Sequence, residues 1–461
     1  MKGKMHKLGW YLALLPLALL LLAGCGRKAE VHRVEVVPEP VFMLKKEGSF
    51  TLHNNPKVSV VGVGQNSVTV KHIMKSMRQA QLHPRLVAIS QDNDIELVIN
   101  DTVNSELGDE GYLLEVRSSG LRLSANTETG LLYAYQTLEQ MLPNDVANVA
   151  YSSIVLPECT ILDYPRFAWR GLNLNLSGNA LSVKGLKKVI DVMAHYKLNR
   201  LCLEGGDWSA DTLMWMVDST KVFSREEILS LRSYAADMGV KLLTDSLPLV
   251  TWSLRAAFDS AGRDRSVVVC PDDYWQFYRY QADPRYQPLA SEGVLTLSHV
   301  YEFDPLPLGT NSHLEAGIVG AECRLLTDCT SDLKQVEYML LPRLLAVSEC
   351  LWSQREKKDW RRFRLKVEEQ KEYLTAKGYR YCEGSFTPLF IARRVDNQTM
   401  NIAISTEVPN TYIFYTTDRS IPTRESAVYI GPINLARGTH IKILPVYKGT
   451  ERDSVYEFVI K

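Results

Sequence analysis

Residues 163–177, which read DYPRFAWRGLNLNLS, and their continuation to Gly205-Gly206-Asp207-Trp208 decide the fold. Leucines alternate with asparagines over 172–176, which indicates a β-strand. Residues 183–196 place apolar side chains at helical spacing after Ser182, a residue type that caps helices. A short apolar run at 201–203 follows. The stretch therefore predicts a strand–helix–strand unit, whose parallel strands put any site at their carboxyl ends.

The first 25 residues have the pattern of a bacterial lipoprotein signal peptide. Three of the first seven residues are lysines, and an apolar run at 10–23 leads into Leu22-Ala23-Gly24-Cys25. Small residues of this kind precede a cysteine that is lipidated after cleavage, so we expect Cys25 to carry the lipid. A plain signal peptide and an N-terminal anchor helix are the alternatives. We expect the mature protein in the bacterial cell envelope, periplasmic or at the outer membrane, tethered by its lipid.

Composition sets further bounds. The 461 residues suffice for two or three domains. Lys+Arg and Asp+Glu number 53 each, so the charge balance predicts no nucleic-acid partner. Besides Cys25, seven cysteines are scattered without CxxC spacing, which predicts neither a disulfide framework nor a zinc site, and we expect no cofactor. Cys202, Cys270 and Cys323 lie in or beside apolar runs and are expected to be small buried hydrophobic residues.

Several segments together resemble one enzyme family. PRFAWRG (165–171) and SVKGLKKVIDVMAHYKLNRL (182–201) resemble the opening of the catalytic barrel of family-20 glycoside hydrolases, the β-N-acetylhexosaminidases. HVYEFDPLP (299–307), VEYMLLPRLLAVSECLWS (336–353) and DWRRF (359–363) resemble its closing strand and helix. GYLLEV (111–116) and LSANTETGLLYAYQTLEQML (123–142) resemble the non-catalytic domain that precedes the barrel. The resemblance runs from about residue 45 to the end.

The resemblance and the strand patterns predict an α/β multidomain chain. After a linker at 26–45 we expect an α+β domain at 46–160, a shortened TIM-like β/α barrel at 161–375, and an immunoglobulin-like β-sandwich at 385–461 that resembles the chitobiase C-terminal domain. The barrel region has fewer strand candidates than the eight of such a barrel: 172–176, 201–203, 240–243, 249–252, 267–270 and 317–321. We therefore expect an open or distorted sheet, or a partner chain that covers its edges.

The family's acid motif is absent. In family 20 the substrate's acetamido oxygen attacks the anomeric carbon, a carboxylic acid protonates the leaving oxygen, and a neighbouring aspartate orients the acetamido group. The resemblance would put this pair in H-x-G-G-D-E after the fourth strand, but the chain contains no GGDE. We infer that the fourth and fifth strands, between 240–243 and 249–252, are deleted. Glu204-Gly205-Gly206-Asp207 is similar to the motif but stands at the second-strand position, where a glycine-rich turn is the simpler interpretation.

Three other family positions have changed. The tyrosine and aspartate of Tyr-x-Asp correspond to Gln276 and Tyr278, or after a slip of two to Tyr274 and Gln276. The family's L-W-T-E corresponds to Leu325-Leu326-Thr327-Asp328, and H-W-H corresponds to Cys202-Leu203-Glu204. The residues that hold the acetamido oxygen, stack on the sugar and orient the acid are thus altered.

The resemblance leaves three candidate substrate-binding residues. Arg170 matches the arginine that binds sugar hydroxyls, with a structural ion pair at the barrel floor as the alternative. Trp252 matches an aromatic wall of the acetamido pocket, with a core position as the alternative. Asp328 matches the hydroxyl-binding carboxylate.

Two functions remain open. In the first, the protein is a catalytically silent lipoprotein that binds glycan containing N-acetylhexosamine, or a protein partner, at the remodelled barrel mouth. In the second, it is a β-N-acetylhexosaminidase with a replacement acid, for which Asp207, Asp245, Asp273 and Asp328 are candidates. Because the lost groups act as one unit in catalysis, the first function is favoured.

Overall fold

The structure, a computed structural model, describes residues 27–31, 34–88, 93–178, 181–209, 214–216, 222–244, 249–251, 253–261, 266–451 and 455–461. The expected signal peptide with Cys25, and also Asp245 and Trp252, lie outside the described residues, and the side chain of Asp207 is not described. The chain divides into two compact units, one of the residues up to Glu35 with Phe42–Leu162, the other of Val36–Val41 with Asp163–Lys461. Among the described residues, no helix is both long and apolar enough to cross a membrane.

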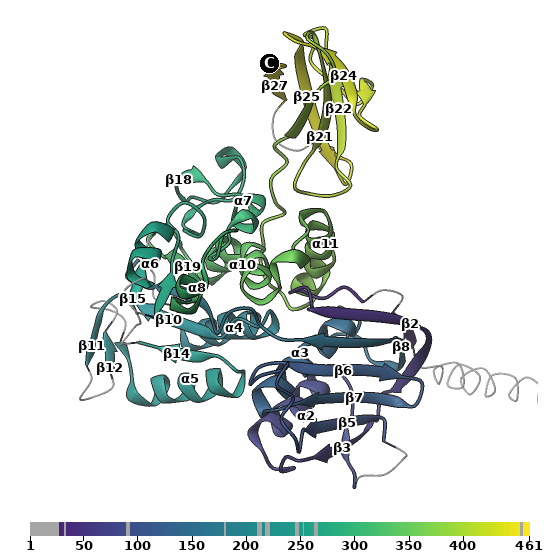
Figure 1. Cartoon of the computed structure of the whole chain (residues 1–461), viewed down its shortest axis with the longest axis vertical. Coiled ribbons are helices and arrows are strands. Elements are labelled where there is room, and N and C mark those ends of the chain that lie inside the picture. The colour runs from purple at the N-terminus through teal and green to yellow at the C-terminus, as the bar shows by residue number, and fades with distance from the viewer. Residues whose placement is uncertain are drawn as a thin grey trace, which may run out of the picture. The chain divides into compact units, whose positions relative to one another are not determined.

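The first unit is built on an eight-stranded sheet, in the order β1-β8-β6-β7-β5-β3-β4 with β2 paired to β8 (Figure 1). The elements are β1 (Arg27–Glu30), β2 (Phe42–His53), β3 (Lys57–Val61), α2 (Val68–Gln79), β4 (Arg85–Leu86), β5 (Ile95–Ile99), β6 (Tyr112–Arg117), β7 (Gly120–Ala125), α3 (Glu128–Met141) and β8 (Tyr151–Asp163). Thr127 caps α3 by accepting a hydrogen bond from the Gly130 N–H. The strands, the turn at 118–120 and the helix agree with the expected α+β domain.

The expected linker at 26–45 is wrong. Strand β1 pairs in parallel with β8, and β2 already begins at Phe42. Between them Val36 and Val37 are buried, and Val37 belongs to the hydrophobic core of the second unit. The charged and proline-rich composition that suggested a linker hid this alternation of apolar residues, which makes the segment part of the fold.

The second unit contains a six-stranded parallel sheet in the order β14-β10-β9-β19-β16-β15. Its strands are β9 (Trp169–Asn175), β10 (Arg200–Glu204), β14 (Lys241–Leu243), β15 (Leu249–Thr251), β16 (Val267–Val269) and β19 (Ile318–Leu326). All six expected strands are present. The last is longer than expected, because it continues through the charged Glu322 and Arg324 to Leu326.

The two edge strands of this sheet are neighbours in the chain. Only residues 244–248 connect the carboxyl end of β14 to the start of β15. Such a connection spans at most about 20 Å, whereas five gaps between flat neighbouring strands already measure about 24 Å. Because the chain must also return along the strand direction, the sheet has to curl so that its edges approach. The six strands are paired in one open order, in agreement with the expected open or distorted sheet, while its relation to a barrel stays a prediction.

The two faces of the sheet differ in polarity because side chains alternate along a strand. Leu172 and Leu174 of β9, with Leu201 and Leu203 of β10, are buried in the hydrophobic core of the unit. The alternate positions form the concave inner face, on which the strand register brings polar side chains together. The alternation of leucine and asparagine over 172–176 therefore reflects two environments. The leucines face the hydrophobic core, and the asparagines lie on the polar inner face of the sheet.

Helices pack around this sheet, and α10 contacts both β9 and β19 (Figure 1). The other elements are α4 (Val183–His195), β11 (Asp207–Ser209), β12 (Met214–Met216), β13 (Val222–Phe223), α5 (Arg225–Asp237), α6 (Leu254–Ala261), β17 (Arg279–Tyr280), η1 (Pro284–Tyr286), β18 (Ser291–Val294), α7 (Leu297–Glu302), α8 (Ser312–Gly317), α9 (Leu333–Leu340), α10 (Arg343–Trp352), η2 (Arg355–Lys357) and α11 (Trp360–Ala376). As expected, Ser182 caps α4 through the Gly185 N–H.

The C-terminal region forms two antiparallel sheets around one apolar core of isoleucines and Met400. One sheet contains β20 (Leu389–Arg394), β21 (Thr399–Ser405) and β24 (Ile433–Ala436). The other contains β22 (Tyr412–Thr416), β23 (Ala427–Val428), β25 (His440–Tyr447), β26 (Thr450–Glu451) and β27 (Tyr456–Val459). This two-sheet arrangement agrees with the expected β-sandwich, while its immunoglobulin-like character stays a prediction.

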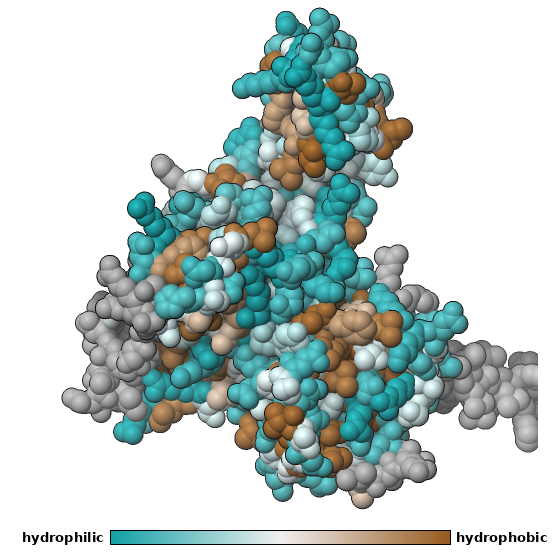
Figure 2. Space-filling model, viewed as in Figure 1, coloured by the Kyte–Doolittle hydropathy of each residue, from teal (hydrophilic) through white to brown (hydrophobic). Residues whose placement is uncertain are grey.

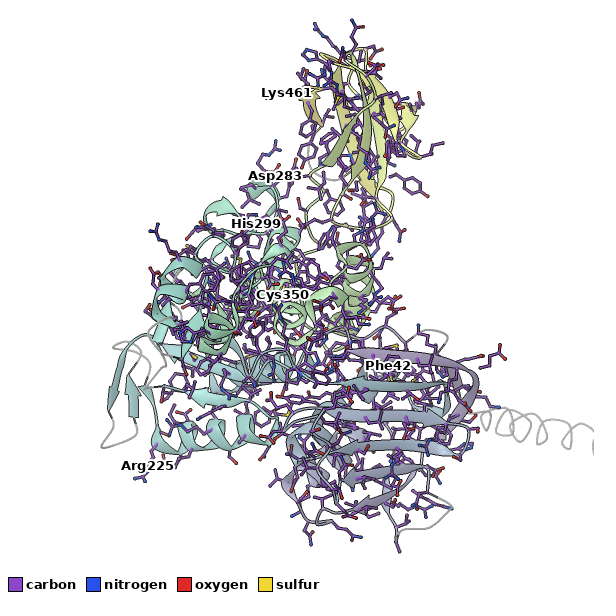
Figure 3. The ribbon with its side chains drawn as sticks, viewed as in Figure 1. Phe42, Arg225, Asp283, His299, Cys350 and Lys461 are labelled. Atoms are coloured by element: carbon purple, nitrogen blue, oxygen red, sulfur yellow. The ribbon has the colours of Figure 1, made fainter. Side chains whose placement is uncertain are left out.

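The cysteines behave as expected. Cys202, Cys270 and Cys323 are free and buried, and Cys350, labelled in Figure 3, is a free thiol among packed side chains. Burial raises the pKa of each of these thiols, which keeps them protonated and unreactive. On the face seen in Figure 2, apolar and hydrophilic residues are interspersed.

Candidate functional site

The carboxyl ends of the parallel strands bring five polar residues together. In the strand register Glu204 of β10 lies opposite Asn175 of β9, and Arg324 of β19 lies opposite Asn173. Gln276, which follows β16, forms an isolated parallel bridge with Arg324. These residues occupy the concave face near the end at which βα barrels place their sites. We call this region the mouth.

One asparagine links two glutamates on the inner face. The Asn173 Nδ2 donates to Glu204 Oε1 at 2.7 Å and to Glu322 Oε1 at 3.3 Å. Arg324 Nη2 donates to the other Glu204 oxygen at 2.9 Å, which makes an ion pair. The two carboxyl groups therefore share one amide group but differ in their charged neighbours.

Glu322 is sealed in the sheet, with no exposed surface. The Trp169 indole N–H and the Cys202 thiol donate to its Oε2. Burial raises the pKa of Glu322, and the negative Glu204 raises it further, although the three hydrogen bonds act in the opposite direction. Its protonated form is favoured, but no sugar can reach a side chain in this position.

Glu204 and Arg324 are the accessible members of the network. Their side chains are 29% and 22% exposed. Glu204 accepts hydrogen bonds from Asn173 and Arg324 and is the carboxyl group that a ligand can reach. The mouth thus separates a buried carboxyl group, whose pKa is raised, from a reachable one that forms an ion pair with arginine.

Two aspartates flank this pair. Asp272 follows β16 and accepts a hydrogen bond from Gln276 Nε2 at 3.1 Å, and its residue is exposed. Asp328 follows β19 and is exposed beside Gly178, where an added Cβ would lie 2.3 Å from the Asp328 Cα. This close approach requires glycine at position 178 and fixes the Asp328 loop at the end of β9. The candidate Asp328 thus lies beside Gly178, just after the carboxyl end of β19.

Arg170 lies elsewhere. It shares the outward-facing positions of β9 with Leu172 and Leu174, and it has no exposed surface. Its Nε donates to the Lys197 carbonyl at 2.8 Å and its Nη1 to the Phe167 carbonyl at 2.7 Å. The expected contact of Arg170 with sugar hydroxyls is incompatible with this position, and the ion pair of the structural alternative stays a prediction. The reason is parity, because the even-numbered residues of β9 face the helices.

A buried ion pair accompanies Arg170. Lys197 Nζ and Asp163 Oδ2 are 3.0 Å apart, and the indole N–H of Trp352 donates to the other Asp163 oxygen at 2.9 Å. The guanidinium of Arg170 lies over the Trp352 ring at 4.9 Å. Burial lowers the pKa of Lys197 despite the opposing effect of Asp163. This cluster is part of the core beneath the sheet, with no access for a ligand.

The remaining candidates from the sequence lie at different places in the second unit. Asp273 is exposed in the loop after β16, and Asp207 begins β11. Of the alternatives for the family tyrosine, Gln276 is 98% buried at the mouth, while Tyr274 packs against His299 and Phe303. Within the described part of the chain, no group of three or more His, Cys, Asp or Glu side chains could hold a metal ion.

Sequence reasoning missed Asn173, Arg324 and Glu322. A signal existed, because β19 places a glutamate and an arginine two residues apart within an otherwise apolar run. Period-two charges in a buried strand indicate an inner polar face. Together these residues can recognise polar groups by hydrogen bonding, but they offer no reachable protonated acid.

Family models match most of the chain. The model described as glycosyl hydrolase family 20, domain 2, matches residues 33–164, and that of the catalytic domain matches residues 167–207 and 235–355. A model described as Fn3 associated matches residues 402–460. The catalytic match thus contains every strand of the six-stranded sheet and omits the segment with β12 and β13.

Relatives with curated names are β-hexosaminidases. One from Porphyromonas gingivalis is 21% identical over 599 residues, covering 95% of this chain and 77% of the relative. That alignment is longer than this chain, so segments of the relative have no counterpart here. A β-N-acetylhexosaminidase of Cellulomonas fimi is 29% identical over 173 residues, 37% of this chain and 34% of the relative.

Solved structures share the fold. The N-acetyl-β-hexosaminidase of Streptomyces plicatus, in complex with Thio-NAglucal, superposes with a TM-score of 0.66 at 18% identity. The superposition covers 76% of this chain and 97% of that one. A likeness at this identity concerns the fold and carries no residue of the site with it.

The Arg170→Ala variant should be destabilised and should not lose ligand binding selectively. Two buried carbonyl groups lose their donor and a cavity opens, so we expect a loss of about 3–5 kcal/mol in the free energy of unfolding. Denaturant titration followed by tryptophan fluorescence measures it. Arg285→Ala, whose arginine is 60% exposed, is the control and should cost less than about 1 kcal/mol. A stable Arg170→Ala protein that fails to bind sugar would contradict this assignment.

Glu322→Gln should change how stability depends on pH. Since the folded-state pKa of Glu322 is raised, its contribution is greatest below the unfolded pKa of about 4.3 and is lost as the pH rises through the folded value. Glutamine cannot ionise, so the variant should gain stability relative to the wild type from pH 4 to pH 8. Denaturation midpoints over this range measure the difference. The exposed Glu302→Gln is the control, and equal slopes for both variants would rule out the burial effect.

Proposed function

Because the chain belongs to glycoside hydrolase family 20, we propose that it binds glycans containing N-acetylhexosamine without hydrolysing them. The observation that carries the proposal is the connection of residues 244–248 between β14 and β15. Five residues leave no room for the two strands that the family has between these positions, and the acid motif belongs to the first of them. The relatives named β-hexosaminidases supply the sugar class.

The chemistry at the mouth supports a binding role. The reachable carboxyl group, Glu204, is engaged in an ion pair with Arg324. Glu322 has the raised pKa that a general acid needs, but it is fully buried. Catalysis requires both properties in the same side chain, within reach of the leaving oxygen.

An active β-N-acetylhexosaminidase with a replacement acid is the second candidate. The exposed Asp272 and Asp328 at the strand ends favour it, since a carboxyl group there could approach a bound sugar. Asp207, Asp245 and Asp273 remain further candidates for that role. The first candidate, the non-catalytic binder, also includes a protein partner. Such a partner could pair with the edge strands β14 or β15, because edge strands attract pairing with another chain.

The full-length protein should bind N-acetylglucosamine tetramer, as measured by calorimetry, and should not release the chromophore from a chromogenic N-acetylglucosaminide. Arg170→Ala is unsuitable as a control because it perturbs the core. Turnover above the uncatalysed rate that disappears in Asp272→Asn or Asp328→Asn would establish the second candidate and refute the silent one.

We also propose that the protein is an envelope lipoprotein anchored through Cys25. Three features in the order typical of a lipoprotein signal peptide support this proposal: a basic start, an apolar run, and small residues directly before the cysteine. Cys25→Ala expressed in a Gram-negative bacterium should leave the membrane fraction, because the acylated site is lost. Immunoblots of the fractions measure it, with Cys329→Ala as the matched control. Unchanged membrane association of Cys25→Ala would contradict lipidation at this position.

A further inference from the structure

We propose that the hexosamine unit held at the mouth carries a free amino group in place of an acetamide. The inference rests on the proposed function, since it concerns the same site. It follows from the balance of hydrogen-bond donors and acceptors on the described residues, and from their charge. No relative or family model assigns this preference.

Acceptors exceed donors at the mouth. Each Glu204 oxygen accepts one hydrogen bond, from Asn173 or from Arg324, while a carboxylate can accept about four. Among the described residues nothing donates to the Asn173 Oδ1, but this side chain is 99% buried and, like Glu322, is out of a sugar's reach, so Glu204 is the acceptor that a ligand can use. The site therefore favours a ligand with several donors.

The charge of the mouth points the same way. Glu204 is balanced by Arg324, and the raised pKa of Glu322 favours its neutral form. Asp272 and Asp328 are exposed, and within the described part of the chain neither forms an ion pair with a basic side chain. Among the described residues of the mouth, carboxyl groups therefore outnumber basic groups, and this charge attracts a cation and raises its association rate.

An ammonium group satisfies both requirements, with three donors and a positive charge. An acetamide brings one N–H and a carbonyl that needs a donor of its own. The residue matching the family's acetamide-holding tyrosine is Gln276, and its Nε2 already donates to Asp272. In the alternative alignment that tyrosine is Tyr274, which packs against His299 and Phe303. Deacetylation thus removes a carbonyl to which neither Gln276 nor Tyr274 donates, and it adds N–H donors from which the accessible Glu204 can accept hydrogen bonds.

The first test compares two probes on the full-length protein in detergent at low salt. Calorimetry measures glucosamine tetramer against N-acetylglucosamine tetramer. A charge-assisted hydrogen bond gained corresponds to at least about tenfold tighter binding of the amino tetramer. Equal or tighter binding of the acetylated tetramer would overturn the inference and leave the proposed function standing. Binding of neither probe would overturn both.

The second test assigns the preference to Glu204. Glu204→Gln should lose the preference for the amino tetramer, about tenfold, while the exposed Glu106→Gln of the first unit, the matched control, keeps it. The double variant Glu204→Gln with Arg324→Gln avoids a stranded guanidinium and should give the same loss in a folded protein. A preference that survives in both variants would overturn the assignment.

A third probe separates recognition from general attraction. Tetralysine carries the same number of side-chain amines as the glucosamine tetramer but no sugar ring. We expect it to bind at least about tenfold more weakly than the amino tetramer at physiological salt, where screening removes long-range attraction. Equal binding of tetralysine would mean that charge alone acts, and would overturn the inference.

Discussion

The connection between β14 and β15 constrains the rest of the second unit. Five residues join strands that stand at opposite edges of a six-stranded sheet, so the sheet must curl although it lacks the two strands that would complete a barrel. The ends of β10, β9, β19 and β16 are thereby brought round a common concave face. The sequence does not contain the family's GGDE motif, and the mouth is made from the strands of this sheet.

A polar inner face is the consequence. Barrel interiors are usually filled by branched apolar side chains, but here Glu322, Arg324 and Asn173 occupy such positions. Charges in this environment are tolerated only when paired or neutralised. Arg324 is paired with Glu204, and Glu322 favours its protonated form. The hydrogen bonds and the ion pair that stabilise these polar groups also engage Glu204, and Glu322 is buried out of reach. The Glu204 oxygens remain the accessible acceptors at the mouth.

Much of the fold follows from local sequence. The six strands, the capped helix after Ser182 and the two-sheet C-terminal region were all predictable, because alternation and capping are properties of adjacent residues. The site was not. Arg170 matches a family position in a linear comparison, yet strand parity turns it toward the helices. The Glu204–Arg324 pair joins residues 120 positions apart, which only the strand order brings together. The segment at 36–41 was missed for the same reason.

That segment also affects the order in which the chain can fold. Lys366 donates to the Val36 carbonyl at 2.9 Å across 330 positions, and it forms an ion pair with Glu39, as does Arg362. Because synthesis runs from the N-terminus, residues 36–41 are made long before helix α11, which binds them. Contacts of such sequence separation slow folding. Until α11 arrives, Val36 and Val37 remain an unshielded apolar segment, so completion of the second unit has to wait for nearly the whole polypeptide.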